Sequence, residues 1–416
     1  MSKVDKNDKI FIKNTGMLYL MTVATYLFPL ILLPYLTRVL QPDAYGLVMF
    51  MTATITYFQI FVDFGFNFSS TKIISQCSSN YSLISKTVFA TIFAKLILVL
   101  ISFIIFICMI PFVQILRNNI LLCYLYFASM AITIFLTDFL YRGIEMMEII
   151  TFRYVLAKLI STILTFMLVQ SPDDIILIPC LNIIGTFVAV VFTWLHMYKV
   201  LHIRFVPIKI SDVLFQIKKS SIYFVATFAT TLFGATNTFI LGLLNFSVEQ
   251  IACWSLAFQI ITAAQAVFNP IINSLYPHMT SKIDLKLVKK LILISVPVII
   301  IGIIVGIVFS PFVVNVFAGP GYEEAILVLQ LLLPLLLFSF IGQLIGFPVL
   351  GAMDEEKKVT FTIIIASSFH VVGIFILWKF NFIGITSLAI LRTSTEFLLC
   401  MQRVVLLKKA LQTKQD

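Results

Sequence analysis

The side chains of this chain that could do chemistry lie inside long apolar stretches. Arg392 and Glu396 are four residues apart in LRTSTEFLL, so on a helix they share one face and can neutralise each other. An unpaired charge at mid-membrane costs at least about 2.5 kcal/mol, so such groups are expected to be paired or used. Two interpretations stay open, a structural ion pair or a cavity-facing site for a substrate or a proton.

Other charges stand alone in their apolar surroundings. Lys95 lies well inside an apolar segment, where it either extends to the cytoplasmic interface or lines a cavity. Asp63 and Asp138 each end an apolar segment, near Lys72 and Arg142 in sequence. Solvation at the surface is the simpler account of these two carboxylates.

Neutral polar side chains concentrate between residues 227 and 273, in segments long enough to cross a lipid bilayer. They either hold helices together or line a wet groove for a polyhydroxylated cargo. The dipeptide Asn269-Pro270 predicts a local break in a helix, because proline removes a backbone donor. The polar residues of this region are Thr227, Thr230, Thr231, Thr236, Asn237, Thr238, Gln259, Gln265, Asn269 and Asn273.

Familiar catalytic and metal-binding motifs are missing from the sequence. The six cysteines are scattered without a CxxC pair, and the four histidines have no metal-ligand spacing. His370 alone lies well inside an apolar span, where a packed, hydrogen-bonded histidine is favoured over a proton carrier. There is no GxxxxGK[ST] motif, so no ATP-hydrolysing site, no metal and no cofactor is expected.

Composition shows which elements must position these residues. With 60% hydrophobic and 12% charged residues over 416 positions, the chain is expected to be an all-α integral membrane protein. Apolar runs of about 20 residues predict twelve transmembrane helices. We place them at 17–36, 46–64, 86–110, 119–140, 152–169, 175–196, 220–243, 252–275, 291–310, 326–350, 359–378 and 383–402.

The basic residues predict the orientation of these helices. Of the 29 Lys and Arg residues, only Arg38, Arg117 and Lys379 fall in odd-numbered bends, and Lys95 and Arg392 fall inside spans. The others flank the even-numbered bends and both termini, which predicts that both termini are cytoplasmic. The net charge of +10 is therefore a signal of topology and gives no reason to expect nucleic-acid binding.

An internal similarity divides the twelve spans into halves. YLTRVLQPDAYGLVMFMTATITYF and, later, FILGLLNFSVEQIACWSLAFQIITAA each join two spans through a short bend with one acidic residue. Six spans separate them, so the repeat predicts two parallel six-helix lobes, as in two-lobed transporters. The expected lobes are 1–197 and 220–416, joined by a basic cytoplasmic loop at 198–219.

Several segments resemble one known family. NTGMLYL, PLILLPYLTRVLQPDAYGLVMF and YFQIFVDFGFNFSSTKIIS are similar to the opening of Wzx-type O-antigen flippases. These form the polysaccharide-biosynthesis branch of the multidrug/oligosaccharidyl-lipid/polysaccharide (MOP) exporter superfamily. NTFILGLLNFSVEQIACWSLAFQI and FAGPGYEEAILVLQLLLPLLLF look like landmarks of the second half.

The resemblance implies a flippase of the bacterial inner membrane. Its substrate would be an undecaprenyl-pyrophosphate-linked oligosaccharide, moved to the periplasmic leaflet by alternating access among membrane lipids. Its expected partners are a polymerase and a chain-length regulator of the same pathway. For some relatives the superfamily also implies coupling to H⁺ or Na⁺, for which the candidate residues here are Asp63, Asp138 and Glu396. The candidate substrate-binding residues are Arg38, Lys72, Lys95, Arg142, Asn237, Gln259, Asn269 and Arg392.

Two alternatives stay open. A multidrug or cation antiporter of the same superfamily would share the architecture but would more plausibly centre on buried carboxylates and aromatic side chains. An integral O-antigen polymerase would be an enzyme with a large periplasmic loop, and the short bends expected on that side count against it.

Overall fold

The structure is a computed structural model that describes residues 3–77, 80–231, 236–281 and 283–413. All regular secondary structure within these ranges is helical. Nine helical segments of the described residues are long and apolar enough to cross a membrane, and the first, Lys13–Gln76, covers both the first and the second expected spans. The expected all-helical membrane class is therefore confirmed.

The described chain divides into two compact units. Unit 1 comprises Met1–Leu40 and Phe50–Phe228, and unit 2 comprises Gln41–Met49 and Ala229–Asp416. This division differs from the expected lobes at both the joint and the first bend. Helix α9 (Ile210–Thr231) packs within unit 1, where the ring of Phe224 stacks on Phe64 with centroids 4.5 Å apart. Ser220 of α9 also hydrogen-bonds to Ser69.

The first two spans form one long helix, α1 (Lys3–Asp63), that is interrupted only at Gln41. Gln41 has φ 58° and ψ 173°, outside helical geometry, and Pro42 follows at the first position of the second half. Proline is favoured there because its fixed φ suits a helix start and its missing N–H would be unpaired anyway. The expected bend is therefore present, and Gln41 is the one residue within α1 that departs from helical geometry.

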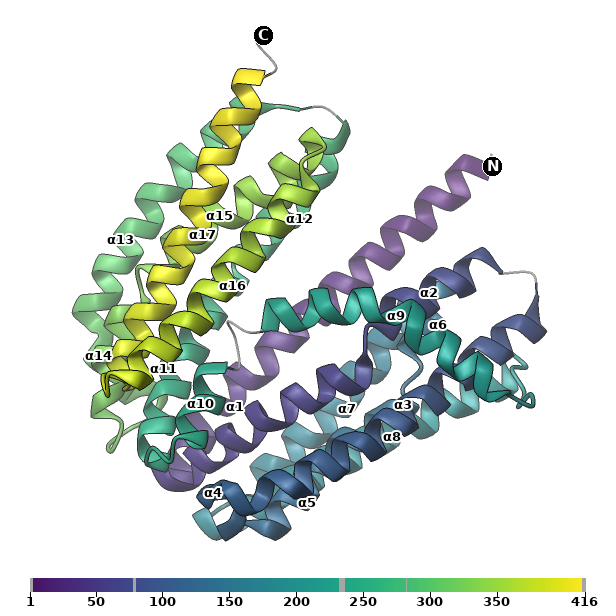
Figure 1. Cartoon of the computed structure of the whole chain (residues 1–416), viewed down its shortest axis with the longest axis horizontal. Coiled ribbons are helices and arrows are strands. Elements are labelled where there is room, and N and C mark those ends of the chain that lie inside the picture. Colours follow the sequence, from purple (N-terminus) through teal and green to yellow (C-terminus); the bar gives the residue numbers. More distant parts are fainter. Residues whose placement is uncertain (1–2, 78–79, 232–235, 282, 414–416) are drawn as a thin grey trace. The chain divides into compact units, whose positions relative to one another are not determined.

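Unit 1 is built around packed membrane helices. Helix α7 packs along α8, α8 also packs on α5, and α2 packs along α6 (Figure 1). Gly65 begins α2 at φ 77°, and a Cβ there would lie 2.5 Å from Tyr223, so glycine suits both the turn and the close approach. The remaining helices of unit 1 are α2 (Phe66–Gln76), α3 (Tyr81–Met109), α4 (Gln114–Asn118), α5 (Ile120–Ala131), α6 (Asp138–Gly143), α7 (Met147–Leu168) and α8 (Leu177–Lys199).

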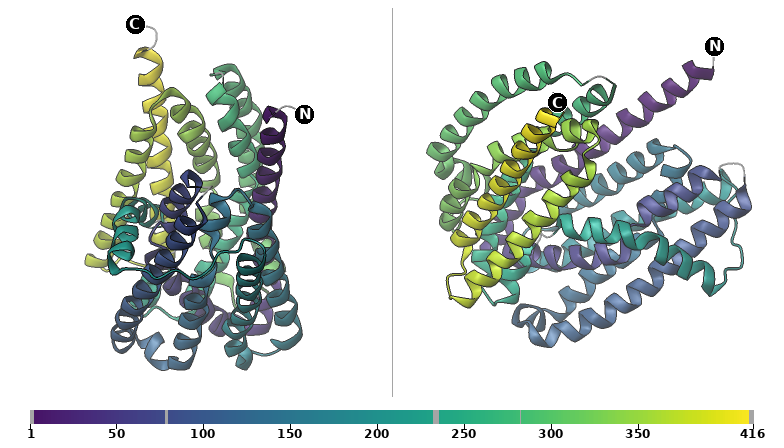
Figure 2. Two further views of the ribbon diagram at one scale, coloured as in Figure 1. Left: turned by 90° about the vertical axis from the view of Figure 1, so that its right-hand side faces the viewer. Right: turned by 45° about the horizontal axis from the view of Figure 1, so that its top comes forward.

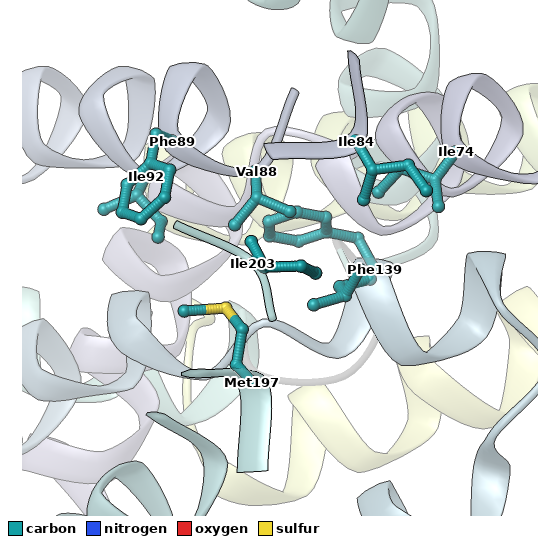
Figure 3. Packing of buried hydrophobic residues seen from close by; sticks show 9 residues of the cluster. Ile74, Ile84, Val88, Phe89, Ile92, Phe139, Met197 and Ile203 are labelled. Carbon is teal, nitrogen blue, oxygen red and sulfur yellow. The ribbon is translucent and has the colours of Figure 1, made fainter. Parts of the chain in front are cut away.

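Apolar side chains fill the space between these helices at one end of unit 1. In Figure 3, Ile203 lies close to Val88 of α3 and Phe139 of α6. Met197, near the end of α8, belongs to the same cluster. The segment after α8 is thus anchored by burial, and this packing fixes the ends of α2, α3, α6 and α8 relative to one another. The buried members of the cluster are Ile74, Ile84, Val88, Phe89, Ile92, Phe139, Leu140, Met197 and Ile203.

Unit 2 has α17 at its centre. Helices α14, α15 and α16 all contact α17, and the right-hand view of Figure 2 shows α16 beside α17. The expected break at Asn269-Pro270 is confirmed, since α11 ends at Ala266 and α12 begins at Asn269. The helices of unit 2 are α10 (Thr236–Leu243), α11 (Val248–Ala266), α12 (Asn269–Ser281), α13 (Leu285–Phe317), α14 (Glu323–Leu332), α15 (Leu335–Leu344), a π-helical turn at Ile345–Leu350, α16 (Glu356–Lys379) and α17 (Ile385–Thr413).

Candidate functional site

Lys95 and Asp63 form an ion pair in unit 1, in which the lysine is buried and the aspartate is partly exposed. Lys95 Nζ lies 2.7 Å from Asp63 Oδ1, and only 3% of Lys95 is exposed. Gln59 donates from Nε2 to the other carboxylate oxygen at 2.8 Å. Asp63 keeps part of the expected exposure, since 34% of its side chain is accessible, and it also has an ionic partner that the sequence does not predict, Lys95 of α3. Lys95 itself lies buried on this carboxylate and does not extend to the interface.

Asp138 and Arg153 form a second ion pair in unit 1. Arg153, only 2% exposed, donates from Nη1 to the Thr193 hydroxyl at 2.9 Å, and its guanidinium lies 5.9 Å from the centroid of the Tyr141 ring. The charge of Asp138 is therefore compensated by Arg153 and does not require Arg142, the basic residue near it in sequence. The fork of donors and the flat face of arginine allow this mixture of ionic, hydrogen-bonding and aromatic contacts.

Arg392 and Glu396 form the third pair, within α17 of unit 2. Arg392 Nη1 lies 2.7 Å from Glu396 Oε2, and the two residues are 7% and 8% exposed. The ion pair expected from their spacing is thus confirmed. All three candidate ion-coupling carboxylates have a basic partner, so a coupling ion would have to compete with that partner for the carboxylate.

His370 joins three helices of unit 2 and is fully buried. Its Nδ1 lies 2.9 Å from the Thr395 hydroxyl, and its Nε2 lies 3.1 Å from the Asn237 side chain. The Thr395 hydroxyl donates its proton to the Leu391 carbonyl, so it accepts from His370 Nδ1–H. The atom of Asn237 that faces Nε2 is the amide oxygen Oδ1, to which an Nε2–H donates. A neutral imidazole with its proton on Nδ1 would accept at Nε2 from the Asn237 amide nitrogen after a 180° rotation of the amide group.

Gln259 and the first bend pack closely within unit 2. Tyr45 donates its hydroxyl to Gln259 Oε1 at 3.0 Å. A Cβ on Gly46 would lie 1.8 Å from the Val248 carbonyl oxygen, so only glycine fits at this contact. Gln265 donates to the Ser339 hydroxyl at 2.7 Å. Asn237, Gln259 and Gln265 thus all hold helices together, which favours the packing alternative for the polar residues of this region.

The other candidate residues differ in exposure. Arg38 and Lys72 are exposed, whereas Arg142 and Asn269 are half-buried. Lys72 and Arg142 lie on α2 and α6, which pack along each other, so the structure brings these two cations to one helix pair. Asn269 is the first residue of α12. Thr230 has a side chain outside the part of the chain that is described.

One ion pair lies at the start of α9. Lys86 Nζ is 2.9 Å from Asp212 Oδ1, and the second Asp212 oxygen accepts from the backbone N–H of Lys209 at 3.1 Å. The hydrogen bond from Lys86 lowers the pKa of the Asp212 carboxyl below its usual value. At neutral pH this carboxylate is charged and holds the beginning of α9 on α3.

Three cations lie deeper among the helices than the sequence predicts. The sequence places Arg153, Lys158 and Arg403 at the cytoplasmic ends of spans, whereas Arg153 and Arg403 are buried and Lys158 is half-buried. Helix α7 begins at Met147 rather than at residue 152, so Arg153 and Lys158 lie deeper in the helix than expected. Arg403, 6% exposed, donates from Nη1 to the Gly342 carbonyl at 2.7 Å and ties α17 to α15. The apolar residues at 149–150 indicate an earlier start of this helix, which would have placed Arg153 and Lys158 inside the span.

Comparison with known proteins decides the family. The polysaccharide biosynthesis protein family matches residues 11–283. The chain belongs to this family. An Escherichia coli (strain K12) protein named as an O-antigen transporter is 26% identical over 86% of this chain and 88% of its own length. A Shigella dysenteriae protein of the same name is 27% identical over 75% of this chain and 78% of its own length.

Solved structures show the fold of this polysaccharide biosynthesis protein. A multidrug resistance MATE family transporter of the MOP superfamily aligns with a TM-score of 0.73 at 14% identity, covering 97% of this chain and 99% of that one. The lipid II flippase MurJ aligns with a TM-score of 0.70 at 13% identity, covering 95% and 87%. The expected MOP-superfamily fold is confirmed.

Proposed function

We propose that this polysaccharide biosynthesis protein is a flippase for lipid-linked polysaccharide repeat units. The observation that carries the proposal is the family match over residues 11–283 on a MOP-superfamily fold. Relatives that cover most of the chain are named as O-antigen transporters, which favours a polysaccharide cargo over a drug. The substrate proposed is an undecaprenyl-pyrophosphate-linked O-antigen repeat, moved from the cytoplasmic to the periplasmic leaflet by alternating access.

The proposed path uses cations for the pyrophosphate and neutral groups for the sugars. Lys72 and Arg142, on the packed pair α2 and α6, would attract the pyrophosphate first. Arg38, exposed near the first bend, would contact it late in the cycle. Asn269 would act at the break between α11 and α12. Four further candidates are engaged in internal contacts and would act by exchanging them, namely Lys95, Asn237, Gln259 and Arg392.

Energy for the cycle is proposed to come from an ion gradient, carried by H⁺ or Na⁺, because the sequence has no ATPase motif. Protonation of Asp63 would cancel its attraction for Lys95, and Na⁺ would compete with the same ammonium. Asp138 and Glu396 offer the same exchange with their arginines. Export that stays unchanged in D63N, D138N and E396Q, with and without an ion gradient, would contradict this coupling.

The proposed setting is the bacterial inner membrane with both termini in the cytoplasm, as the distribution of basic residues indicates. The protein would act as a transporter without enzymatic activity. It would work among membrane lipids, together with the polymerase and the chain-length regulator of the pathway. Nucleic acid is not proposed as a partner.

A deletion strain tests the proposal directly. Surface polysaccharide is resolved on a gel, and the leaflet location of the lipid-linked repeat units is measured in parallel. We expect no surface polymer, with single repeats trapped on the cytoplasmic face. Lipid A cores capped by one repeat would mean that export continues and chain growth fails, which would favour a polymerase. Normal polymer with increased sensitivity to cationic drugs would favour a multidrug antiporter.

A further inference from the structure

Unit 1 contains a cavity of about 300 Å³ between α1, α7, α8 and the segment from α5 to the turn at Ile132–Phe135. Lys158 lies on its wall, midway along the 22-residue helix α7. The volume lies at the lower end of that of small-ligand sites. It suits one sugar ring or a phosphate group. Hydroxyl and amide groups make up most of its polar lining, from Thr52, Thr56, Ser129, Thr133, Asn182 and Thr186.

The charge of this cavity is unbalanced. Lys158 is the one charged residue on its wall, and no described carboxylate forms an ion pair with the Lys158 ammonium. Lys95 and Arg153, the buried cations among the described residues of unit 1, each have a carboxylate partner, whereas Lys158 is half-buried. An unpaired ammonium at mid-helix is costly, and intramembrane charges of this kind commonly mark a pathway for substrates or ions.

The neutral wall of the cavity is itself held in place. Gln59 donates from Nε2 to Asp63 at 2.8 Å, and its Oε1 lies 3.2 Å from the Thr133 hydroxyl, which also lies 2.7 Å from the Met130 carbonyl oxygen. Asp63 in turn is held by Lys95. The Gln59 amide therefore has a fixed orientation, and the Asp63 carboxylate is directed away to its own cation. An anion in the cavity would meet hydroxyls, amides and one ammonium without a competing free carboxylate.

We propose that this cavity is a binding subsite for an anionic, hydroxyl-rich group, with Lys158 as its cation. The inference rests on the proposed flippase function, since the lipid-linked repeat would supply the anion. The chemistry fits two sources, the diphosphate of the lipid carrier or an acidic sugar of the repeat. In both, the ammonium contacts the charge while the surrounding hydroxyls and amides exchange hydrogen bonds with oxygen atoms.

Thermal unfolding of the purified full-length protein tests the subsite, because a ligand that binds the native state raises the unfolding midpoint with its concentration. The detergent must have no sugar headgroup. The probes are sodium pyrophosphate, sodium glucuronate and glucose, each compared with sodium chloride at matched ionic strength. The variants are Lys158→Met and Lys158→Arg, with Lys199→Met as the control at an exposed lysine at the end of α8.

We expect at least one anionic probe to raise the midpoint, with an apparent affinity at least tenfold weaker in K158M and close to wild type in K158R and K199M. Pyrophosphate acting alone would identify the diphosphate as the source, and glucuronate would identify an acidic sugar. No effect of either anion, an equal effect of glucose, or an unchanged response in K158M would overturn the proposal. Should K158M fail to fold, the isosteric Thr186→Val must weaken the response severalfold.

The leaflet assay separates this inference from the proposed function. A wild-type protein that translocates repeat units in cells but binds neither anion in detergent would overturn the subsite alone. A protein that binds an anion through Lys158, but whose deletion leaves repeat units on the periplasmic face, would overturn the flippase function alone.

Discussion

A double-mutant cycle on Arg392 and Glu396 distinguishes a structural ion pair from a working site. The single variants are Arg392→Met and Glu396→Gln, which keep side-chain length while removing one charge each. The double variant removes both charges. The two residues lie one turn apart on α17, so the backbone position of each group is fixed by the helix and is unchanged across the cycle.

The magnitude follows from distance and burial. Two unit charges 2.7 Å apart attract by about 6 kcal/mol at an effective dielectric constant of about 20. Much of this offsets desolvation, and removing one partner of a buried pair typically costs about 3–5 kcal/mol because the other charge is left uncompensated. We expect each single variant to lose about that much stability and the double variant to lose less than either. The exposed Lys358–Glu355 pair should contribute less than about 1 kcal/mol, which makes Lys358→Met the control.

Denaturation in mixed detergent micelles measures the four stabilities, and export of repeat units in a deletion strain measures function. Single variants that each cost less than about 1 kcal/mol, with additive effects in the double, would refute the reasoning, because no buried coupling would then exist. A double variant that is stable and still exports would show that the pair is structural. A stable double variant that does not export would place Arg392 and Glu396 in the transport cycle.

Three further predictions concern packing and pH. Gly46→Ala should cost several kcal/mol in a thermal or detergent unfolding assay because its Cβ would collide with the Val248 carbonyl, whereas Gly302→Ala, in open space, should be neutral or stabilise by up to about 1 kcal/mol. His370→Leu should cost about 2–3 kcal/mol in the same assay, since it leaves two buried polar partners unsatisfied. The pKa of Asp212 is lower in the folded state, so its contribution is present at neutral pH and is lost as the pH falls through that pKa. Hydrogen exchange at the start of α9 should accelerate over that range, and Asp212→Asn should remove this pH dependence.

The fold could be predicted from the sequence to the extent that it depends on apolar length. Runs of about 20 apolar residues predicted the helical class, and Asn269-Pro270 predicted the break before α12. The start of α9 at Ile210, ten residues before the expected 220, could not be derived in this way. It depends on tertiary contacts, in which Phe224 stacks on Phe64 and Ser220 meets Ser69.

The candidate site was predictable only where its partners are close in sequence. Arg392 and Glu396 form the pair that i, i+4 spacing indicates. The partner of Asp63 could not be predicted in this way, because Lys95 lies 32 residues away on another helix, whereas the basic residue nearest in sequence is Lys72. The charge pattern along a single sequence identifies which groups need a partner, but helix packing decides which partner each receives.

The distribution of paired and unpaired charge bears on the choice of cargo. A carrier of cationic drugs gains from buried carboxylates that are free to meet a cation, yet Asp63, Asp138 and Glu396 are each occupied by a basic side chain. Lys158, by contrast, faces a cavity lined by neutral polar groups. A cavity with one ammonium among neutral polar groups favours an anion over a cation. Charge reversal tests this argument: Lys158→Glu should abolish export of an anionic lipid-linked repeat, and any gain in transport should be for cations.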